Sequence, residues 1–265
     1  MAEIKEGPLK DMRGHLGKAT IYQRGEKTFI RETHIEQPYR LSRKQLVLRE
    51  QIAHNNILWR RLKTTGRTYF EGGVDAYRRF MSVNRLSPTV YLTKDQLRSN
   101  TSLLLPNMAV SSGPMPPIIY QFGEVDGQPA LLTNLTSEDM RNGEHLLYVL
   151  RQEDIHWQYG DEHSQVDISV IPVAPNQNIE IPNLGNISLV NVPSKLRTPH
   201  TSKEGSVAIV GDIFADPMLG FALVRIQDGH VSSQHVVTNC TYYERYTTEE
   251  ALQAAAKSYD GLTGE

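Results

Sequence analysis

The densest group of side chains that could carry out chemistry lies between His156 and His163. This stretch supplies two imidazoles and two carboxylates, which are common ligands of divalent metals. The two histidines flank a turn at Gly160, and their spacing matches no zinc motif. We therefore predict a solvated loop over 156–163, with a metal site there as the alternative.

Other catalytic patterns are missing from the sequence. There is no G-x-S-x-G turn, no Walker loop, no G-x-G-x-x-G and no H-E-x-x-H. Cys240 is the single cysteine, which excludes an intrachain disulfide and a cysteine-rich zinc site, and no basic neighbour lowers its pKa. The sequence thus predicts no catalytic residue, no metal and no cofactor, and a protein that is not an enzyme. An enzyme with an unrecognised site near 156–163 is an alternative hypothesis.

The overall charge is nearly balanced, but its distribution along the chain is not. Residues 1–100 contain 20 Lys and Arg against 10 Asp and Glu, a net charge of +10. Residues 101–265 contain 8 against 20, a net charge of −12. This asymmetry predicts a basic surface in the first part of the chain and an acidic surface in the remainder.

A helix over 42–63 should carry the basic surface. Ser42 and Gln45 have the spacing of a capping box, and Thr65-Gly66 ends the helical pattern. Apolar periodicity predicts a buried stripe, with Trp59 as its anchor, through Leu41, Leu48, Ile52, Trp59 and Leu62, widened by Leu46, Ala53, Ile57 and Leu58. The polar face is basic, and Glu50 is the one acidic residue of the predicted helix. The candidate contact residues of this basic face are Arg40, Arg43, Lys44, Arg49, Arg60, Arg61 and Lys63.

Three interpretations of this basic face are open. It could be a solvated helix face, it could dock on an acidic protein surface, or its arginines could contact nucleic-acid phosphates. The acidic remainder of the same chain offers a surface of the second kind.

The pattern of helices and strands along the chain predicts an α+β fold that is mainly β. The β part should be sandwich-like or a small barrel, and the N-terminal region should be helical and basic. Residues 1–39 should form a glycine-punctuated extended arm and a short hairpin of strands 19–23 and 28–31. Residues 40–99 form the basic helical region, with a second helix over 74–83 that ends at Asn84. Residues 100–246 form the β-sandwich-like domain, and residues 247–265 form a terminal helix and tail.

Short β-type runs alternate with turn residues beyond residue 100. The strongest local signal is Asp228-Gly229, whose two residues suit a type I′ hairpin turn. The predicted strands are 118–122, 130–134, 145–151, 166–171, 187–192, 206–214, 220–227 and 230–239.

The C-terminal helix is predicted over 251–259. A capping box at Thr247–Glu250 precedes it, and its narrow apolar side should dock on the sandwich or on a neighbouring molecule. The apolar side consists of Leu252, Ala255, Ala256 and Tyr259.

Both ends of the chain resemble a family of uncharacterised bacterial proteins. The stretch from Gly17 to Arg31 is similar to that family's glycine-rich arm and Gly-Lys…Gly-Lys-Thr…Arg hairpin. Residues 221–234 are similar to its closing hairpin, a hydrophobic strand, a D-G turn and a V-S strand. A Ser-x-x-Gln…Arg…Trp…Leu helix lies between them, here at Ser42, Gln45, Arg49, Trp59 and Leu62, and resembles segments of phage structural proteins more loosely. The family has no assigned activity, so the resemblance implies a fold and no catalytic residue.

These observations favour a non-enzymatic structural or assembly protein. We expect it to associate with other protein subunits as a ring-like homo-oligomer, as a component of a phage particle or phage-like assembly. The alternative is a cytoplasmic nucleic-acid-binding accessory protein that uses the basic helix. No apolar run approaches the ~20 residues of a membrane span and no secretory signal is present, so we expect a cytoplasmic or virion location without membrane contact.

Overall fold

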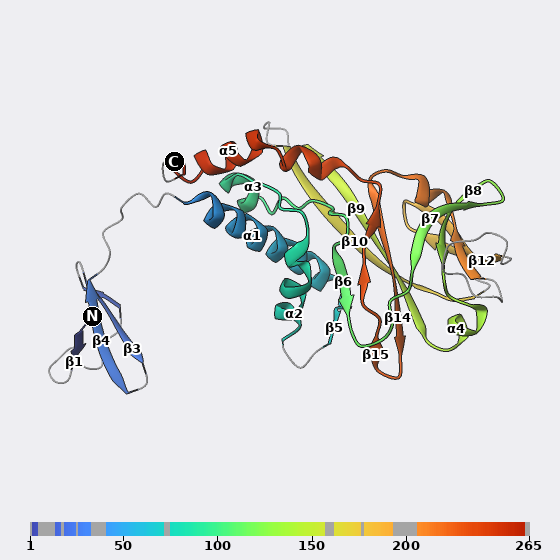
Figure 1. The fold of residues 1–265 in the computed structure, drawn as a ribbon, viewed down its shortest axis with the longest axis horizontal. Helices are drawn as coiled ribbons and strands as arrows, with labels where there is room; N and C mark the ends of the chain where they lie inside the picture. Colours follow the sequence, from blue (N-terminus) through green and yellow to red (C-terminus); the bar gives the residue numbers. More distant parts are fainter. Residues whose placement is uncertain are drawn as a thin grey trace.

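The computed structural model describes residues 2–4, 14–16, 19–24, 26–32, 41–71, 75–156, 162–175, 178–192 and 206–262 (Figure 1). Strands outnumber helices in these residues, and the long helix lies in the N-terminal third of the chain. The fold is α+β and mainly β, which confirms the predicted fold class. No described helix combines the length and apolar composition of a membrane span.

The N-terminal residues form a small antiparallel sheet. Its strands are β1 (Ala2–Ile4), β2 (Gly14–Leu16), β3 (Ala19–Arg24) and β4 (Lys27–Glu32), in the order β1-β4-β3-β2. The predicted hairpin is confirmed as β3–β4. The prediction of an extended arm is wrong at β1 and β2, which pair with β4 and β3. An isolated hairpin would leave the backbone groups on both of its outer sides unpaired, and these two strands pair with them. Residues 33–40, which include the candidate Arg40, lie outside the described residues.

Helix α1 (Arg43–Thr64) begins and ends as predicted. The Gln45 N–H donates to Ser42 Oγ at 3.3 Å, and the Ser42 N–H donates to Gln45 Oε1 at 2.9 Å, which completes the capping box. After the helix, Gly66 adopts φ 69°, the left-handed conformation that commonly follows a helix C-terminus.

The buried side of α1 differs from the predicted stripe. Leu48 and Ile52, which were expected in the core, are 54% and 42% exposed. The buried row instead runs at four-residue spacing through Leu46, Glu50, His54, Leu58 and Leu62. The prediction is confirmed for Leu41, Leu46, Ile57, Leu58 and Leu62 and wrong for Leu48 and Ile52, because the titratable Glu50 and His54 occupy buried positions in place of apolar residues. Trp59 is half-buried, with its ring 5.2 Å from that of Phe80.

Short helices and a small sheet complete the helical layer. They are α2 (Ala76–Val83), η1 (Asn84–Leu86), α3 (Lys94–Arg98), and the small sheet of β5 (Tyr69–Phe70), β6 (Ala109–Ser112) and β16 (Gln234–His235). Helix α2 ends at Asn84 as predicted, and Phe80 is its one fully buried residue. Ala76 and Met81 pack at the margin of the core, and the Tyr77 ring lies 6.0 Å from that of Trp59.

The central sheet is built on two long strands. Its strands are β9 (Glu144–His156), β10 (Glu162–Val173), β14 (Leu219–Gln227), β15 (His230–Val231) and β17 (Val237–Thr238). Asp228 and Gly229 have φ 52° and 79°, which confirms the predicted type I′ turn between β14 and β15. The predicted strand over 230–239 is broken, because β15 and β17 pair with β14 whereas β16 pairs with β6.

The outer sheet has the order β11-β12-β13-β8-β7. Its strands are β7 (Tyr120–Val125), β8 (Gln128–Thr133), β11 (Asn178–Ile181), β12 (Gly185–Val192) and β13 (Ser206–Val210). Two short helices, α4 (Ser137–Arg141) and η2 (Asp212–Ala215), follow β8 and β13, so the strand predicted over 206–214 ends early. A second type I′ turn at Asp126-Gly127, with φ 53° and 79°, joins β7 to β8, and its D-G signal was present in the sequence.

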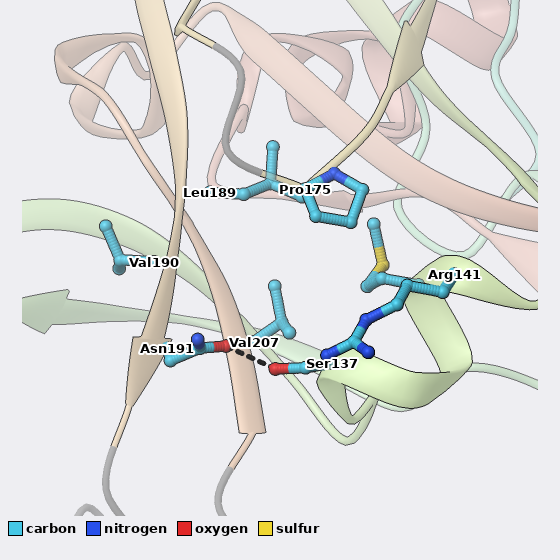
Figure 2. Close-up of a pocket in the computed structure, with 8 residues that line it drawn as sticks. Ser137, Arg141, Pro175, Leu189, Val190, Asn191 and Val207 are labelled. Atoms are coloured by element: carbon cyan, nitrogen blue, oxygen red, sulfur yellow. Dashed lines mark hydrogen bonds between the residues drawn. The ribbon is translucent and has the colours of Figure 1, made fainter.

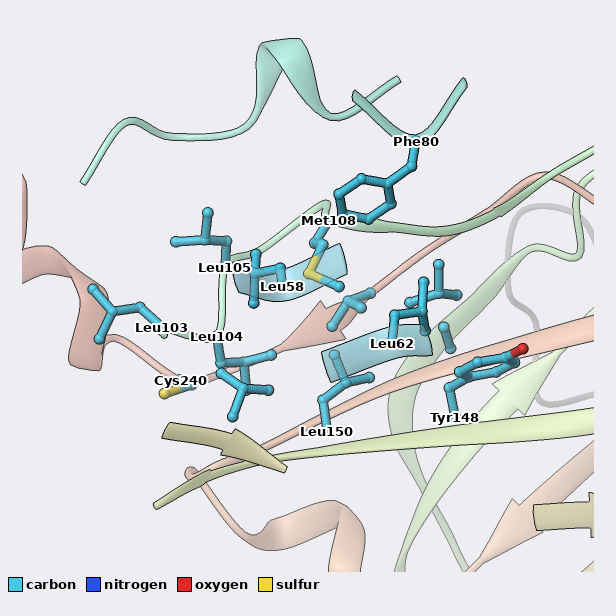
Figure 3. Packing of buried hydrophobic residues seen from close by; sticks show 14 of the residues in the cluster. Leu58, Leu62, Phe80, Leu103, Leu104, Leu105, Met108, Tyr148, Leu150 and Cys240 are labelled. Atoms are coloured by element: carbon cyan, nitrogen blue, oxygen red, sulfur yellow. The ribbon is translucent and has the colours of Figure 1, made fainter. Parts of the chain in front are cut away.

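The central sheet is buried on both faces. Leu146, Tyr148 and Leu150 of β9 face the helical layer, where they pack with residues of α1 and α2 (Figure 3). Leu147 and Val149 face the outer sheet, so β9 contributes to two hydrophobic cores. The protein therefore has three layers, with helices, the central sheet and the outer sheet in that order (Figure 1).

Gly220 permits the close approach of the helical layer to the central sheet. A Cβ atom at this position would lie 2.8 Å from Val236 Cγ1 and 3.0 Å from Leu104 Cδ1. Any larger side chain would force these two residues away from the sheet.

The C-terminal segment docks on α1. It consists of η3 (Tyr242–Tyr246) and α5 (Glu249–Lys257), and the predicted apolar side of α5 is buried against Leu41 and Leu46. The docking partner is thus the chain's own helical layer. The predicted capping box is displaced by one residue, because Thr248 is the N-cap and accepts from the Ala251 N–H at 3.2 Å.

The helical region and the sheets share one core across residue 100. Leu58 and Phe80 lie in the same hydrophobic cluster as Tyr148 and Val224. The division of the chain at residue 100 into separately folding parts stays a prediction.

Burial of β9 on both faces gives the first test of the fold. Leu147→Ala should lower the free energy of unfolding by about 2–5 kcal/mol, because the side chain is fully buried between the two sheets. The matched control is Leu86→Ala, since Leu86 is 93% exposed, and it should change stability by less than about 0.5 kcal/mol. Denaturant titration measures both, and equal losses would contradict the layer arrangement.

Candidate functional site

The structure divides the predicted basic residues of α1 into two groups. Arg43 is paired with α5, where its Nη2 lies 2.6 Å from Glu249 Oε2. The Arg49 guanidinium lies 4.0 Å from the centre of the Tyr259 ring, a cation–π contact. These two arginines therefore hold the C-terminal segment on α1.

The second group faces outward. Lys44, Arg60 and Lys63 are exposed, and Arg61 is half-buried. Arg60 Nε donates to the Asn56 carbonyl at 3.4 Å. Residues 43–86 hold ten Lys and Arg against three Asp and Glu, and one of these three, Glu50, is buried. The helical layer thus presents a basic surface.

Exposed apolar side chains lie within this basic surface. Of the large apolar residues that the structure describes, four are exposed, and three of them, Leu48, Ile52 and Leu86, belong to α1 and η1. Leu48 and Ile52 are one helical turn apart, and the exposed Lys63 lies about three turns beyond Ile52 on the same side. The side chain of Gln51 bonds the Arg85 carbonyl, which holds η1, and so Leu86, beside this part of α1. We call Leu48, Ile52 and Leu86 the apolar patch.

One edge of the outer sheet is acidic. The described strands of that sheet, their β7–β8 and β11–β12 turns and η2 contain four carboxylates and no Lys or Arg. These carboxylates are exposed and lie along the end of the sheet that holds the β7–β8 turn, the end of β11 and the end of β13, with Glu180 and Glu124 on its two outermost strands. We call them the acidic edge: Glu124, Asp126, Glu180 and Asp212.

A polar cluster lies at the far end of the β9–β10 hairpin. Ser164 Oγ donates to Asp154 Oδ1 at 2.7 Å, and Tyr242 bonds both residues. The Arg245 guanidinium stacks 3.5 Å from the centre of the Tyr242 ring. The cluster ties η3 to the sheet through Asp154, Ser164, Tyr242 and Arg245.

The predicted loop at 156–163 is adjacent to this cluster. Pairing of β9 with β10 extends to His156 and Glu162, so the ends of the stretch are strands and not a loop as expected. Residues 157–161 lie outside the described residues. No group of three metal-ligating side chains occurs among the residues that the structure describes.

A small cavity lies between α4 and the outer sheet (Figure 2). It has a volume of about 120 Å³, and Ser137 Oγ donates to Asn191 Oδ1 at 2.6 Å across its rim. The remaining lining residues are Met140, Arg141, Pro175, Leu189, Val190 and Val207. The cavity is lined by the Arg141 cation, the polar Ser137 and Asn191 and five apolar residues, and it offers no nucleophile beside a base.

Two buried titratable residues of α1 hold the segment that crosses the helical layer. Glu50 Oε2 accepts from the Leu92 N–H at 3.0 Å, and His54 Nε2 accepts from the Leu103 N–H at 2.9 Å. Burial raises the pKa of Glu50 to about 7, against smaller lowering effects of the Leu92 bond and Arg49. Burial lowers the pKa of His54 to about 4. Both side chains serve as fixed acceptors for backbone that lies outside regular strands.

Cys240 and His145 are buried as well. Burial raises the pKa of Cys240 to about 11, so its thiol is protonated at neutral pH, as expected for a small hydrophobic residue. Burial and the Arg225 charge lower the pKa of His145 to about 4. Arg225 in turn lies 3.1 Å from Asp139, an ion pair at the end of β14.

Comparison with models of known protein families, with curated proteins and with solved structures finds no match to this chain. The resemblance of both chain ends to a bacterial family therefore stays a prediction.

The apolar patch and the acidic edge were missed at the level of sequence. Leu48 and Ile52 of the patch were assigned to the core because leucine and isoleucine at helical spacing indicate burial. The acidic edge is visible as the absence of Lys and Arg from residues 120–133, 178–192 and 206–215, but only pairing of the strands brings its four carboxylates together.

The pKa shifts of Glu50 and His54 predict opposite effects of pH on stability. The folded pKa of Glu50 lies above its usual 4.5, so its stabilisation is lost as pH rises to about 7. The free energy of unfolding of Glu50→Gln relative to that of wild type should therefore rise by about 3 kcal/mol between pH 4.5 and pH 8. The folded pKa of His54 lies below its usual 6.5, so its contribution to stability is lost as pH falls from 6.5 to about 4. The stability of His54→Gln relative to wild type should therefore rise as pH falls through that range. Denaturant titrations at a series of pH values test both, and differences that do not change with pH would contradict them.

Proposed function

We propose that this protein is a non-enzymatic assembly subunit that associates head to tail with other copies of itself. The observation that carries the proposal is the separation of charge between two outer layers. The helical layer is basic around α1, and the outer sheet ends in the acidic edge. In Figure 1, α1 and β8 lie toward opposite ends of the three-layered body, with β9, β10 and β14 between them.

This arrangement favours a heterologous contact. Two basic surfaces or two acidic edges would repel each other, so the contact should pair a basic surface with an acidic edge. Because these two surfaces lie toward opposite ends of the body, an end-to-end contact of this kind makes copies follow one another head to tail. Such contacts close into a ring or continue as a filament, depending on the rotation between neighbours. Charge complementarity would orient the encounter, and salt would weaken it.

The polar groups of the described residues support a non-enzymatic role. Glu50 and His54 bind backbone N–H groups, and the Asp154–Ser164–Tyr242 cluster fastens η3 to the central sheet. These groups are committed to holding the fold. Membership of a phage particle or phage-like assembly, and the host or virion location that follows from it, stay predictions.

Nucleic-acid binding by the basic surface is the rival proposal. Arg60, Lys63 and the exposed Arg78 and Arg79 of α2 would be its phosphate contacts. Contact with phosphates gives no reason for Leu48 and Ile52 to be exposed in the same surface, whereas contact with protein does. We therefore favour protein association.

Charge reversal tests the head-to-tail proposal. Reversing Lys44, Arg60 and Lys63 to Glu, or Glu124, Glu180 and Asp212 to Lys, should each abolish self-association measured by light scattering at low ionic strength. Asp126 is left unchanged because its left-handed backbone, φ 53°, suits Asp better than Lys. Mixing the two variants should restore association, since each then carries the charge that the other lacks.

The matched control for the acidic-edge variant reverses three exposed carboxylates elsewhere, Asp167, Glu244 and Glu250, to Lys, and so changes the net charge by the same amount as that variant. This control should associate like the wild type. A wild type that stays monomeric at every protein concentration and salt would defeat the proposal, and salt-sensitive DNA retention by that monomer would select the rival.

A further inference from the structure

We propose that the apolar patch on α1 and η1 is the buried centre of the contact between copies, and that the β7–β8 hairpin tip of a second copy occupies it. This inference rests on the proposed head-to-tail association and names the two elements that meet. The tip comprises residues 124–129.

The patch has the composition of an interface centre. Leu48, Ile52 and Leu86 are 54%, 42% and 93% exposed in the single chain. Exposed leucine and isoleucine that cluster within a charged surface mark interaction sites, because burying them on association removes apolar area from water. Nothing in the described fold of this chain buries them.

Cations surround the patch. Lys44 lies one helical turn before Leu48, and Arg85 directly precedes Leu86. Arg60 and Lys63 follow Ile52 along the exposed side of α1. An apolar centre with a basic rim fits an apolar partner with an acidic rim.

The β7–β8 tip has that complementary form. Val125 is flanked by the exposed carboxylates Glu124 and Asp126, and Pro129 follows the turn. Asp126 and Gly127 form a tight type I′ turn, and no atom lies within 4 Å of a Cβ placed on Gly127. The tip therefore projects from the outer sheet and can reach a surface on another molecule.

The remaining exposed apolar residue, Ile119, takes no part in this contact. It is 45% exposed and pairs with Asn134 at the end of the β7–β8 hairpin opposite the tip. Contact of the patch with itself is disfavoured, because Lys44 and Arg85 of both copies would then face each other.

Site-directed disulfide formation tests this contact in the full-length chain. One copy carries Ile52→Cys and the other carries Val125→Cys, while the native Cys240 is buried, with a raised thiol pKa, and is left in place. The mixed pair should form a disulfide roughly tenfold faster than a control pair of Ile52→Cys with Asp167→Cys, because docking raises the effective concentration of the two thiols. Asp167 is exposed on β10, outside both the apolar patch and the β7–β8 tip.

A second variant separates this inference from the proposed function. Leu48→Ser with Ile52→Ser alters exposed positions, so the circular dichroism spectrum should be unchanged while self-association weakens at least about tenfold. If charge reversal abolishes association but these serines do not, and the mixed disulfide forms no faster than the control, the proposed function stands and this contact is overturned. Preferred disulfides between two Ile52→Cys copies would overturn it in favour of a two-fold contact. If every one of these variants still associates like the wild type, both proposals are defeated.

Discussion

The pairing of β9 with β14 is the constraint on which the other layers depend. From Leu146 to Leu150 every side chain of β9 is buried, and Leu219 to Val224 of β14 are buried as well. A strand pair that is apolar on both faces cannot be stable against water on either side, so it requires a layer above and a layer below. The helical layer covers one face and the outer sheet covers the other.

The helical layer meets this requirement with irregular backbone, which has a cost of its own. Residues 101–105 are fully buried outside any strand, and their N–H groups need acceptors. His54 accepts from Leu103, and Gln152 accepts from Leu104 at 2.7 Å. Polar and titratable side chains therefore occupy core positions because they complete backbone hydrogen bonding, and the pKa shifts of Glu50 and His54 follow from that placement.

Coverage of both faces also separates the charges. Since the central sheet lies between them, the two outer layers cannot neutralise each other across the body of one molecule. Part of the basic charge is used internally, where Arg43 and Arg49 hold the C-terminal segment. The rest remains at the surface together with Leu48 and Ile52. A contact between copies would satisfy both the exposed charge and the exposed apolar area.

Local signals determined much of this structure from sequence alone. The Ser42 capping box, the hairpin at residues 19–31, the Asp228-Gly229 turn and the apolar side of α5 depend on neighbours a few residues apart, and the structure confirms them. Tertiary structure decided which face of α1 is buried, because Glu50 and His54 are core residues only where Leu92 and Leu103 pass beside them. It also decided the acidic edge, whose carboxylates come from β7, β11 and the segments that follow β7 and β13 and meet only when the strands pair. Sequence periodicity reports local geometry, whereas the partner of a buried polar group is set by chain that lies far away in sequence.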